Sequence, residues 1–213
     1  RFEIEERVNY KGDIERALNL PQLEKLATRL VELQVESVAV CLLFSFLHPD
    51  HEQQVKSTLA RLLPSTPVLC SSDILPERRE YERTSTTAIS AYLAPTVTRY
   101  IEQMKLELEH LAMTRRFYIM QSNGGLNTPQ TATSNPGSLL LSGPAAGIVA
   151  AARIGVETGF PDLISMDMGG TSFDISLSYE GEVRHTQDSE IEGFPVKIPM
   201  VDIHTLGAGG GSI

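Results

Sequence analysis

One stretch constrains the fold more than any other, residues 163–179, which read Leu-Ile-Ser-Met-Asp-Met-Gly-Gly-Thr-Ser-Phe-Asp-Ile-Ser-Leu-Ser-Tyr. Residues 163–168 form a short, largely apolar run of strand length. From Phe173 to Tyr179, apolar and polar side chains alternate strictly. Such alternation is typical of a β-strand, in which successive side chains point to opposite faces. The sequence therefore predicts two strands joined by a tight turn at residues 169–172.

The composition of this turn suits phosphate chemistry. Gly169 and Gly170 let backbone N–H groups approach an anion without a Cβ in the way. The hydroxyls of Thr171 and Ser172 can donate to phosphate oxygens, and the carboxylate of Asp167 can hold Mg²⁺ through water. The alternative is a plain Gly-Gly hairpin. Either way, the turn joins two strands, unlike the strand–turn–helix of a Walker or Rossmann site.

Composition and charge exclude several classes of protein. A chain of 213 residues forms one or two domains, and no apolar run approaches membrane-spanning length. The net charge of −9 argues against nucleic-acid partners and anionic membranes. Cys41 and Cys70 lie in apolar runs and are predicted to be reduced, buried thiols of a cytoplasmic protein. Since the chain starts without Met or a signal peptide, we expect a piece of a longer protein.

The first part of the chain alternates predicted strands with predicted helices, which favours an α/β architecture with a largely parallel sheet. Pro21 suits the first turn of one helix, and Asp50 with Gln53 forms a capping box for the next. The predicted strands are residues 1–8, 37–46 and 66–70.

The longest helical pattern follows a charged segment at residues 77–87, and Pro95 within it predicts a kink or a fresh start. We interpret the charged segment as a solvated cap with ion pairs. The alternative is that Arg79, Glu80 and Arg83 serve a site or an interface. Upstream, His48, Asp50 and His51 are interpreted as a helix cap with solvated polar groups, because their spacing matches no known metal site.

Two further segments contain closely spaced small residues. Ser142 is predicted to cap a helix, and Gly147 with its neighbouring alanines gives that helix a small face for close packing. Residues 122–125, Ser-Asn-Gly-Gly, follow a predicted strand at residues 116–121. A glycine turn at that place is either a ligand loop or a plain turn.

The last seven residues, 207–213, begin with four glycines in five positions, at residues 207–211. Glycines at a strand's end mark a loop that approaches a ligand or another backbone closely. Asp202 and His204 precede this loop and could ligate a metal or contact a substrate. His204 is equally well interpreted as a structural histidine.

Five of these segments resemble the A-type (hydantoinase A) subunit of the hydantoinase/oxoprolinase family, in the superfamily of actin, sugar kinases and heat-shock chaperone ATPases. The segments are Glu80-Tyr-Glu-Arg-Thr-Ser-Thr-Thr87, Gln121-Ser-Asn-Gly-Gly125, Ser142-Gly-Pro-Ala-Ala-Gly147, Asp167-Met-Gly-Gly-Thr-Ser172 and Gly207-Ala-Gly-Gly-Gly-Ser-Ile213. One departure is Phe173, where the family usually has Thr and heat-shock chaperones have Phe.

The resemblance implies part of a ribonuclease-H-like α/β ATPase fold. Residues 1–160 would be the end of the first lobe, and residues 161–213 the start of the second lobe with its phosphate loop. The first phosphate loop and the adenosine pocket of such ATPases are not in these residues, so the isolated 213-residue chain is expected to be inactive.

The resemblance also implies a function: ATP-dependent hydrolysis of a small cyclic amide, such as 5-oxoproline or a hydantoin, after phosphorylation of its carbonyl oxygen. ATP and Mg²⁺ would be the cofactors, and a hydantoinase B-type subunit or domain the partner. Asp167 would hold Mg²⁺-bound water and Asp174 would support the metal shell or the turn. The nucleotide phosphates would be bound by Gly169, Gly170, Thr171, Ser172, Gly209 and Gly210.

Two alternatives stay open at this point. Related subunits carboxylate ketones with ATP, and the phosphate loop does not separate that chemistry from amide hydrolysis. The other alternative is a non-catalytic module that responds to nucleotide binding by closing its two lobes.

Overall fold

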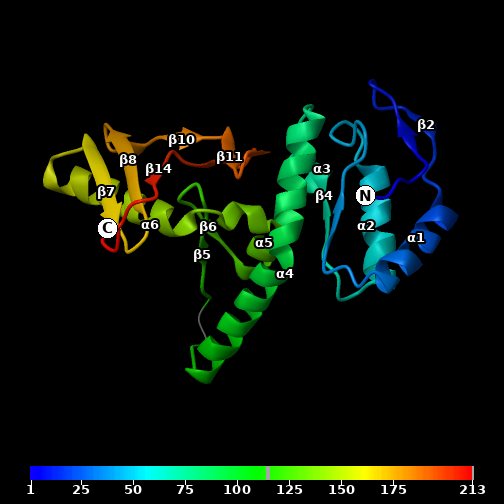
Figure 1. Ribbon diagram of the computed structural model, residues 1–213, viewed down its shortest axis with the longest axis horizontal. Coiled ribbons are helices and arrows are strands. Elements are labelled where there is room, and N and C mark those ends of the chain that lie inside the picture. The colour runs from blue at the N-terminus through cyan, green and yellow to red at the C-terminus, as the bar shows by residue number, and fades with distance from the viewer. Residues whose placement is uncertain (114–115, 213) are drawn as a thin grey trace. The chain divides into compact units, whose positions relative to one another are not determined.

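The computed structural model of the chain describes residues 1–113 and 116–212, which pack into two compact units (Figure 1). The first unit comprises residues 1–113, 133–137 and 190–197, and the second comprises residues 116–132, 138–189 and 198–212. This division by packing is separate from the predicted lobe boundary between residues 160 and 161, which stays a prediction.

The first unit is a mixture of helices and short strands. Its elements are β1 (Arg7–Val8), β2 (Ile14–Arg16), α1 (Leu20–Glu32), β3 (Val38–Val40), α2 (Asp50–Leu62), β4 (Val68–Cys70), α3 (Ser71–Ile74), α4 (Glu80–His110) and β12 (Phe194–Val196). Strand β3 pairs in parallel with β4, and β1 pairs antiparallel with β2. Strand β12 returns to pack on α4, where Lys197 N donates to Thr86 Oγ1 at 3.0 Å.

Helix α1 forms as the sequence predicts. Asn19 caps it by accepting a hydrogen bond from Gln22 N at 3.0 Å, and Pro21 lies in the first turn. Leu23, Ala27 and Leu30 recur at three- and four-residue steps, so they share one face and are buried. This face packs with Val55 and Leu59 of α2 and with β3 and β4 into the core of the first unit.

The strand predicted at residues 37–46 is wrong beyond Val40. Residues 43–47 form turns instead, and Phe44 adopts a left-handed backbone conformation with φ 58°. Its carbonyl accepts hydrogen bonds from Leu47 N and His48 N, which bends the chain away from the sheet. The strand predicted at residues 1–8 likewise shrinks to β1. Two of the three strands predicted in this part of the chain, β3 and β4, pair in parallel as expected, whereas β1 pairs antiparallel with β2.

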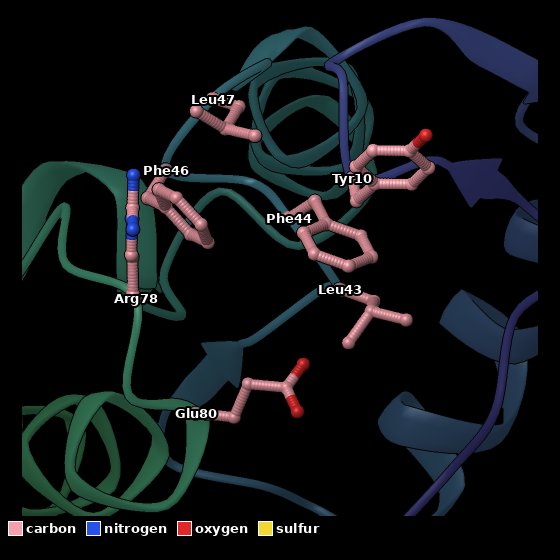
Figure 2. Close-up of a pocket in the computed structure, with 7 residues that line it drawn as sticks. All are labelled: Tyr10, Leu43, Phe44, Phe46, Leu47, Arg78 and Glu80. Atoms are coloured by element: carbon pink, nitrogen blue, oxygen red, sulfur yellow. The ribbon is translucent and has the colours of Figure 1, made fainter.

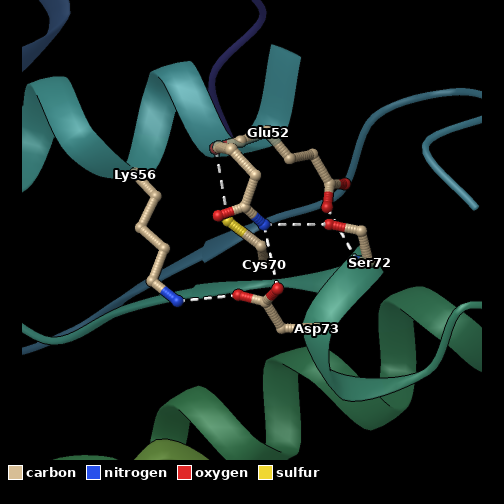
Figure 3. A network of polar contacts seen from close by, with 6 residues as sticks. Glu52, Lys56, Cys70, Ser72 and Asp73 are labelled. Atoms are coloured by element: carbon tan, nitrogen blue, oxygen red, sulfur yellow. Dashed lines mark hydrogen bonds and ion pairs between the residues drawn. The ribbon is translucent and has the colours of Figure 1, made fainter. Parts of the chain in front are cut away.

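The predicted capping box at Asp50 and Gln53 is wrong too, because tertiary contacts use the second side chain. Helix α2 begins at Asp50 after Pro49 without a side-chain cap. Gln53 Nε2 donates to Asp73 Oδ1 at 2.9 Å, next to the Lys56–Asp73 ion pair of 2.7 Å. Figure 3 shows the Lys56 side chain reaching from α2 to Asp73 of α3. Pro95 does not start a new helix, since α4 runs continuously through it.

A buried carboxylate joins the segment after β3 to the start of α3, which directly follows β4. Glu52 is fully buried and accepts hydrogen bonds from Leu42 N, Ser71 Oγ and Ser72 N at 2.8, 2.6 and 2.8 Å. Hydrogen bonds to an ionised carboxylate are stronger than neutral ones, and the charge would be costly to bury without them. Glu52 therefore fixes both the segment after β3 and the start of α3, at the carboxyl ends of the parallel pair.

Cys41 and Cys70 are free thiols, as predicted, and Cys70 is fully buried beside this network. Burial, together with the negative charges of Glu52 and Asp73, raises the pKa of Cys70 from 9.0 to about 12. The folded state therefore holds the proton up to a higher pH than the unfolded state does. The resulting stability is present below pH 9.0 and is lost as the pH rises toward 12.

We expect this shift to appear in the alkylation rate of Cys70, because only the thiolate reacts. In the folded protein the rate of iodoacetamide labelling should rise roughly tenfold per pH unit beyond pH 9.0 and level off only near 12. The same thiol in urea-unfolded protein, measured by mass spectrometry of the labelled peptide, should level off above about 9. A folded-state plateau near pH 9.0 would contradict the assignment.

The second unit is built around a hairpin and one long helix. Its elements are β5 (Ile119–Met120), β6 (Leu126–Asn127), α6 (Ser142–Thr158), β7 (Leu163–Met168), β8 (Phe173–Tyr179), β9 (Glu182–Val183), β10 (His185–Thr186), β13 (Met200–Val201) and β14 (His204–Leu206). The helices α5 (Pro129–Ser134) and η1 (Pro136–Leu139) and the strand β11 (Ser189–Ile191) have residues in both units.

Strands β14, β8 and β7 form an antiparallel sheet in that order, with β9 also paired to β8. Helix α6 packs against β7. An added Cβ at Gly155 would lie 2.5 Å from Leu163 Cδ2, so the close approach is made there and not at the predicted Gly147. Ser142 is the first residue of α6 and not its cap, because Leu141 before it is left-handed with φ 56°.

None of the helices within residues 1–113 and 116–212 combines the length and apolar character that crossing a membrane requires.

Candidate functional site

The predicted strand–turn–strand is present in the structure. Strand β7 ends at Met168, β8 begins at Phe173, and these two residues pair across the hairpin. Gly169 N donates to Ser172 O at 2.9 Å and closes the turn. The turn therefore holds two glycines and two hydroxyl residues at the end of a regular antiparallel ladder.

The glycine-rich segment at the end of the described chain lies directly on this turn. Gly210 N donates to Gly169 O at 3.0 Å, and Gly211 N donates to Gly170 O at 3.1 Å. An added Cβ at Gly209 would lie 2.5 Å from the Gly170 carbonyl and from Thr171 N. Two glycine-rich segments that are far apart in sequence thus form one loop pair, and only a residue without a Cβ fits at the contact.

Two carboxylates face each other next to the loop pair. Asp167 on β7 and Asp174 on β8 are register partners, and Thr205 on β14 is the partner of Asp174 on its other side. Residues paired across antiparallel strands project to the same face of a sheet. Thr205 Oγ1 donates to Asp174 Oδ1 at 2.6 Å, so it fixes that carboxylate. Thr205 is the residue that sequence reasoning missed.

The other two predicted ligands are placed differently. His204 pairs with Ile175 and therefore projects to the face opposite Asp174. Asp202 is held by its backbone, with N donating to Arg184 O and O accepting from Ser176 Oγ, both at 2.8 Å. Within the described part of the chain, no three His, Cys, Asp or Glu side chains form a metal-binding group. A metal role for Asp202 or His204 stays a prediction.

The turn offers hydrogen-bond donors that the protein does not use. In residues 1–113 and 116–212, the N–H groups of Gly170, Thr171 and Ser172 and the two hydroxyls donate no intramolecular hydrogen bond. Gly170 and Thr171 are also exposed, so these donors face solvent. Backbone N–H groups gathered on a glycine turn form an anion-binding concavity. The residues of this turn therefore fit a phosphate group.

The polar face of the hairpin is the buried one. Ser176 and Ser178 are 3% and 5% exposed, whereas Leu177 and Met166 on the other face are 47% and 65% exposed. Ser178 Oγ donates to Pro161 O at 3.1 Å, so its burial is compensated. Phe173, the departure from the family pattern, belongs to the apolar face, because β-strand side chains alternate. It is therefore separate from the row of carboxylates.

The Ser-Asn-Gly-Gly segment makes a tight turn that is tied to its surroundings. Asn123 Oδ1 accepts a hydrogen bond from Gly125 N at 2.9 Å, and Gly124 is left-handed with φ 78°. Ser122 O accepts a hydrogen bond from Val201 N at 2.8 Å. These contacts account for the motif as a structural turn, and a ligand role stays a prediction.

In the first unit, His48 and His51 each lie close to a carboxylate. His51 Nδ1 lies 2.7 Å from Glu6 Oε2, and both side chains are buried, while His48 Nε2 lies 3.6 Å from Asp50. The interpretation of the segment at residues 77–87 as solvated is wrong for Arg83, Thr86 and Thr87, which are buried. Arg83 is 1% exposed and donates to Glu77 O and Leu42 O at 2.9 and 2.8 Å.

Comparison with known sequences identifies the family. The model of the hydantoinase/oxoprolinase family matches residues 83–213, and the model of the hydantoinase/oxoprolinase N-terminal region matches residues 1–63. The chain is 38% identical to caprolactamase subunit alpha of Pseudomonas jessenii over 85% of its length and 26% of the relative. It is 36% identical to the 5-oxoprolinase PfmaA of Pestalotiopsis fici over 95% of its length and 16% of that relative.

Solved structures agree with the sequence match. The ATP-dependent caprolactamase of Pseudomonas jessenii superposes with a TM-score of 0.87 at 35% identity, over 99% of this chain and 30% of the other. A nucleotide-free acetone carboxylase superposes with a TM-score of 0.84 at 25% identity, over 97% of this chain and 29% of the other. The predicted α/β fold is confirmed as a fragment of an actin-like ATPase-type fold. This chain, which spans about a third or less of these relatives, belongs to the hydantoinase/oxoprolinase family.

Proposed function

We propose that the chain is part of an ATP-dependent enzyme that opens cyclic amides, and that the β7–β8 turn binds phosphates of ATP. The observation that carries the proposal is the set of unused donors at Gly170, Thr171 and Ser172 beside two facing carboxylates. The names of the relatives, caprolactamase and 5-oxoprolinase, supply the class of substrate.

On this proposal the loop pair positions the phosphates. The backbone N–H groups of residues 170–172 and the hydroxyls of Thr171 and Ser172 donate to phosphate oxygens. Gly209 and Gly210 fix the shape of the turn through their contacts with Gly169 and Gly170. Phosphoryl transfer depends mainly on such positioning and on charge neutralisation.

Asp167 and Asp174 are the proposed metal-binding carboxylates of the site. Like charges placed directly opposite each other on neighbouring strands repel, so Asp167 and Asp174 are stabilised by a nearby cation. If Mg²⁺ is bound, Asp167 would hold it through water, and Asp174, fixed by Thr205, would support that arrangement. Bound Mg²⁺ neutralises phosphate charge.

The reaction follows from the weakness of an amide as an electrophile. Transfer of the γ-phosphoryl group to the ring carbonyl oxygen forms a P–O bond and releases ADP. Water adds to the activated carbonyl carbon, the C–N bond breaks as the nitrogen takes up a proton, and the ring opens to an acyl phosphate. A second water attacks the acyl carbon and releases phosphate, which carries the original carbonyl oxygen. The products are the opened amino acid, ADP and phosphate.

A second candidate is ATP-dependent carboxylation of a ketone. The superposition on acetone carboxylase over 97% of the chain favours it. The phosphate turn would serve both reactions equally, and the two candidates differ in the acceptor of the phosphoryl group and in the partner subunit.

The active protein is larger than these 213 residues. Since the chain spans 26% of caprolactamase subunit alpha, we assign the first phosphate loop and the adenosine pocket to other parts of the protein. We also propose a B-type hydantoinase subunit or domain as partner, a cytoplasmic location, and no activity for the isolated chain.

The test is ATP turnover by the complete subunit with its partner, in the presence of single cyclic amides. 5-Oxoproline, hydantoin and caprolactam form the first panel, and acetone with bicarbonate forms the second. We expect one cyclic amide to stimulate turnover and to be opened in proportion to the ADP formed. Stimulation by the ketone alone would favour the carboxylase, and turnover without any product would favour a nucleotide switch.

Removing the hydrogen bond between Thr205 and Asp174 should slow turnover without abolishing it. A hydrogen bond to a charged group contributes about 1.5–3 kcal/mol, so Thr205→Val should lower kcat/KM by roughly ten- to a hundredfold. Thr205→Ser keeps the hydroxyl and is the matched control. Equal rates for the Val and Ser variants would show that Thr205 does not position Asp174.

A further inference from the structure

A hollow of about 450 Å³ lies in the first unit, at the turns between β3 and α2 (Figure 2). Its apolar lining comes from the rings of Tyr10, Phe44 and Phe46 and from Leu43 and Leu47. Aromatic and aliphatic walls with few polar groups are typical of sites for small organic ligands. None of these residues belongs to the phosphate turn.

Two opposite charges stand at the edge of the hollow. Arg78 lies on the side of Phe46, and Glu80 lies on the side of Leu43 (Figure 2). Arg79 has an extended backbone and Glu80 begins α4, and both Arg78 and Glu80 line the hollow. Arg79 between them pairs with Glu82 at 3.4 Å instead. Neither Arg78 nor Glu80 forms an ion pair within the described residues, so both charges are available to a ligand.

The walls are held in place by buried groups. The Arg83 guanidinium lies 5.4 Å from the centre of the Phe46 ring and donates to Leu42 O and Glu77 O. It thus joins the turn that carries the rings to the segment that carries the charges. Phe44 is left-handed at φ 58°, a conformation that is strained for a bulky residue and that is found at functional sites.

We infer that this hollow binds a small zwitterion, an amino acid whose charges are separated by a short apolar chain. Its carboxylate pairs with the Arg78 guanidinium, a fork that matches carboxylate geometry. Its ammonium group pairs with Glu80 and faces the aromatic rings, which attract cations. The apolar chain lies among Leu43, Phe44 and Tyr10.

The class of ligand connects this site to the reaction. A simple lactam such as caprolactam opens to an amino acid with one ammonium and one carboxylate, so the hollow fits that product chemically. That identification rests on the proposed function, whereas the site itself rests only on the geometry of the first unit.

The test is binding to the complete protein without ATP, measured by ligand-observed NMR. The probes are straight-chain ω-amino acids from 4-aminobutanoate to 8-aminooctanoate, with hexanoate and hexylamine as single-charge analogues. We expect one zwitterion to bind at least roughly tenfold more tightly than either analogue, since each lost charge removes one charge-assisted pair. Equal affinities for all probes, or no saturable binding, would overturn the inference.

Substitutions of Arg78 and Glu80 test the contribution of each charge to ligand affinity separately. Arg78→Gln should reduce zwitterion affinity to that of hexylamine and leave hexylamine unaffected, while Glu80→Gln should reduce it to that of hexanoate. Arg79→Gln, which removes the same charge one residue away, is the matched control and should keep zwitterion binding. Equal losses for Arg78→Gln and Arg79→Gln would also overturn the inference. Because no nucleotide is present, failure here is distinct from failure of the proposed ATP turnover.

Discussion

The Asp167→Ala variant of the complete subunit should lose ATP turnover by at least about a hundredfold and keep its fold. Loss of one group that acts on the transferring phosphoryl or its metal costs roughly 3 kcal/mol or more in the transition state. Asp167 is exposed and faces Asp174 across the hairpin. Removing one of two facing carboxylates relieves repulsion, so the free energy of unfolding should stay the same or rise slightly.

The measurement combines ADP release with a thermal melt. Met166→Ala is the matched control, because Met166 lies next to Asp167 on the opposite, exposed face of the same strand. It should keep wild-type turnover. Retained turnover in Asp167→Ala, or lost turnover in both variants, would remove Asp167 from the site.

The second large effect on ATP turnover is expected from a substitution at Gly209. In Gly209→Ala the new methyl group would lie 2.5 Å from the backbone of Gly170 and Thr171, so the two loops must separate. Backbone atoms cannot rotate away as a flexible side chain can. We expect ATP turnover to fall by about a hundredfold, because misplacing a reacting group by about 1 Å has that effect.

Gly207→Ala provides the control in the same segment. An added Cβ at Gly207 meets no atom within 4 Å, so this variant makes an identical chemical change without a clash. It should turn over ATP like the wild type. Similar rates for the two variants would show that the contact between residues 209 and 170 does not shape the phosphate turn.

The hairpin was predictable from the sequence because its signal is local. Alternation from Phe173 to Tyr179 and the adjacent glycines specify two strands and a turn without reference to the rest of the chain. The hydroxyl and carboxylate residues then follow from their positions on that hairpin.

The segments that pack on the hairpin were not predictable, because they depend on contacts between parts of the chain that are distant in sequence. Nothing local fixes the register of β14 on β8, and that register alone places Thr205 beside Asp174 and the glycine loop on the turn. The same reason explains the buried polar face of β8. Its serines are buried because Pro161 O and Asp202 O accept their hydrogen bonds.

The wrong predictions in the first unit have a similar origin. Gln53 matches a capping box in sequence, but Asp73 accepts its hydrogen bond. The apolar run to Phe46 matches a strand, but Glu52 and Arg83 hold its Leu42 in a turn. Local propensity is a weak prior, and these tertiary contacts outweighed it.

The central claim is that the ring carbonyl oxygen is phosphorylated. Tracing whether this oxygen appears in the released phosphate tests the claim most directly. The complete enzyme would be given 5-oxoproline or caprolactam labelled with ¹⁸O at the carbonyl, together with ATP, and the released phosphate would be analysed by mass spectrometry. If the carbonyl oxygen is phosphorylated and then leaves with the phosphate, the label appears in the phosphate as the ring opens. Opened product that retains all of the label, with unlabelled phosphate, would contradict the account.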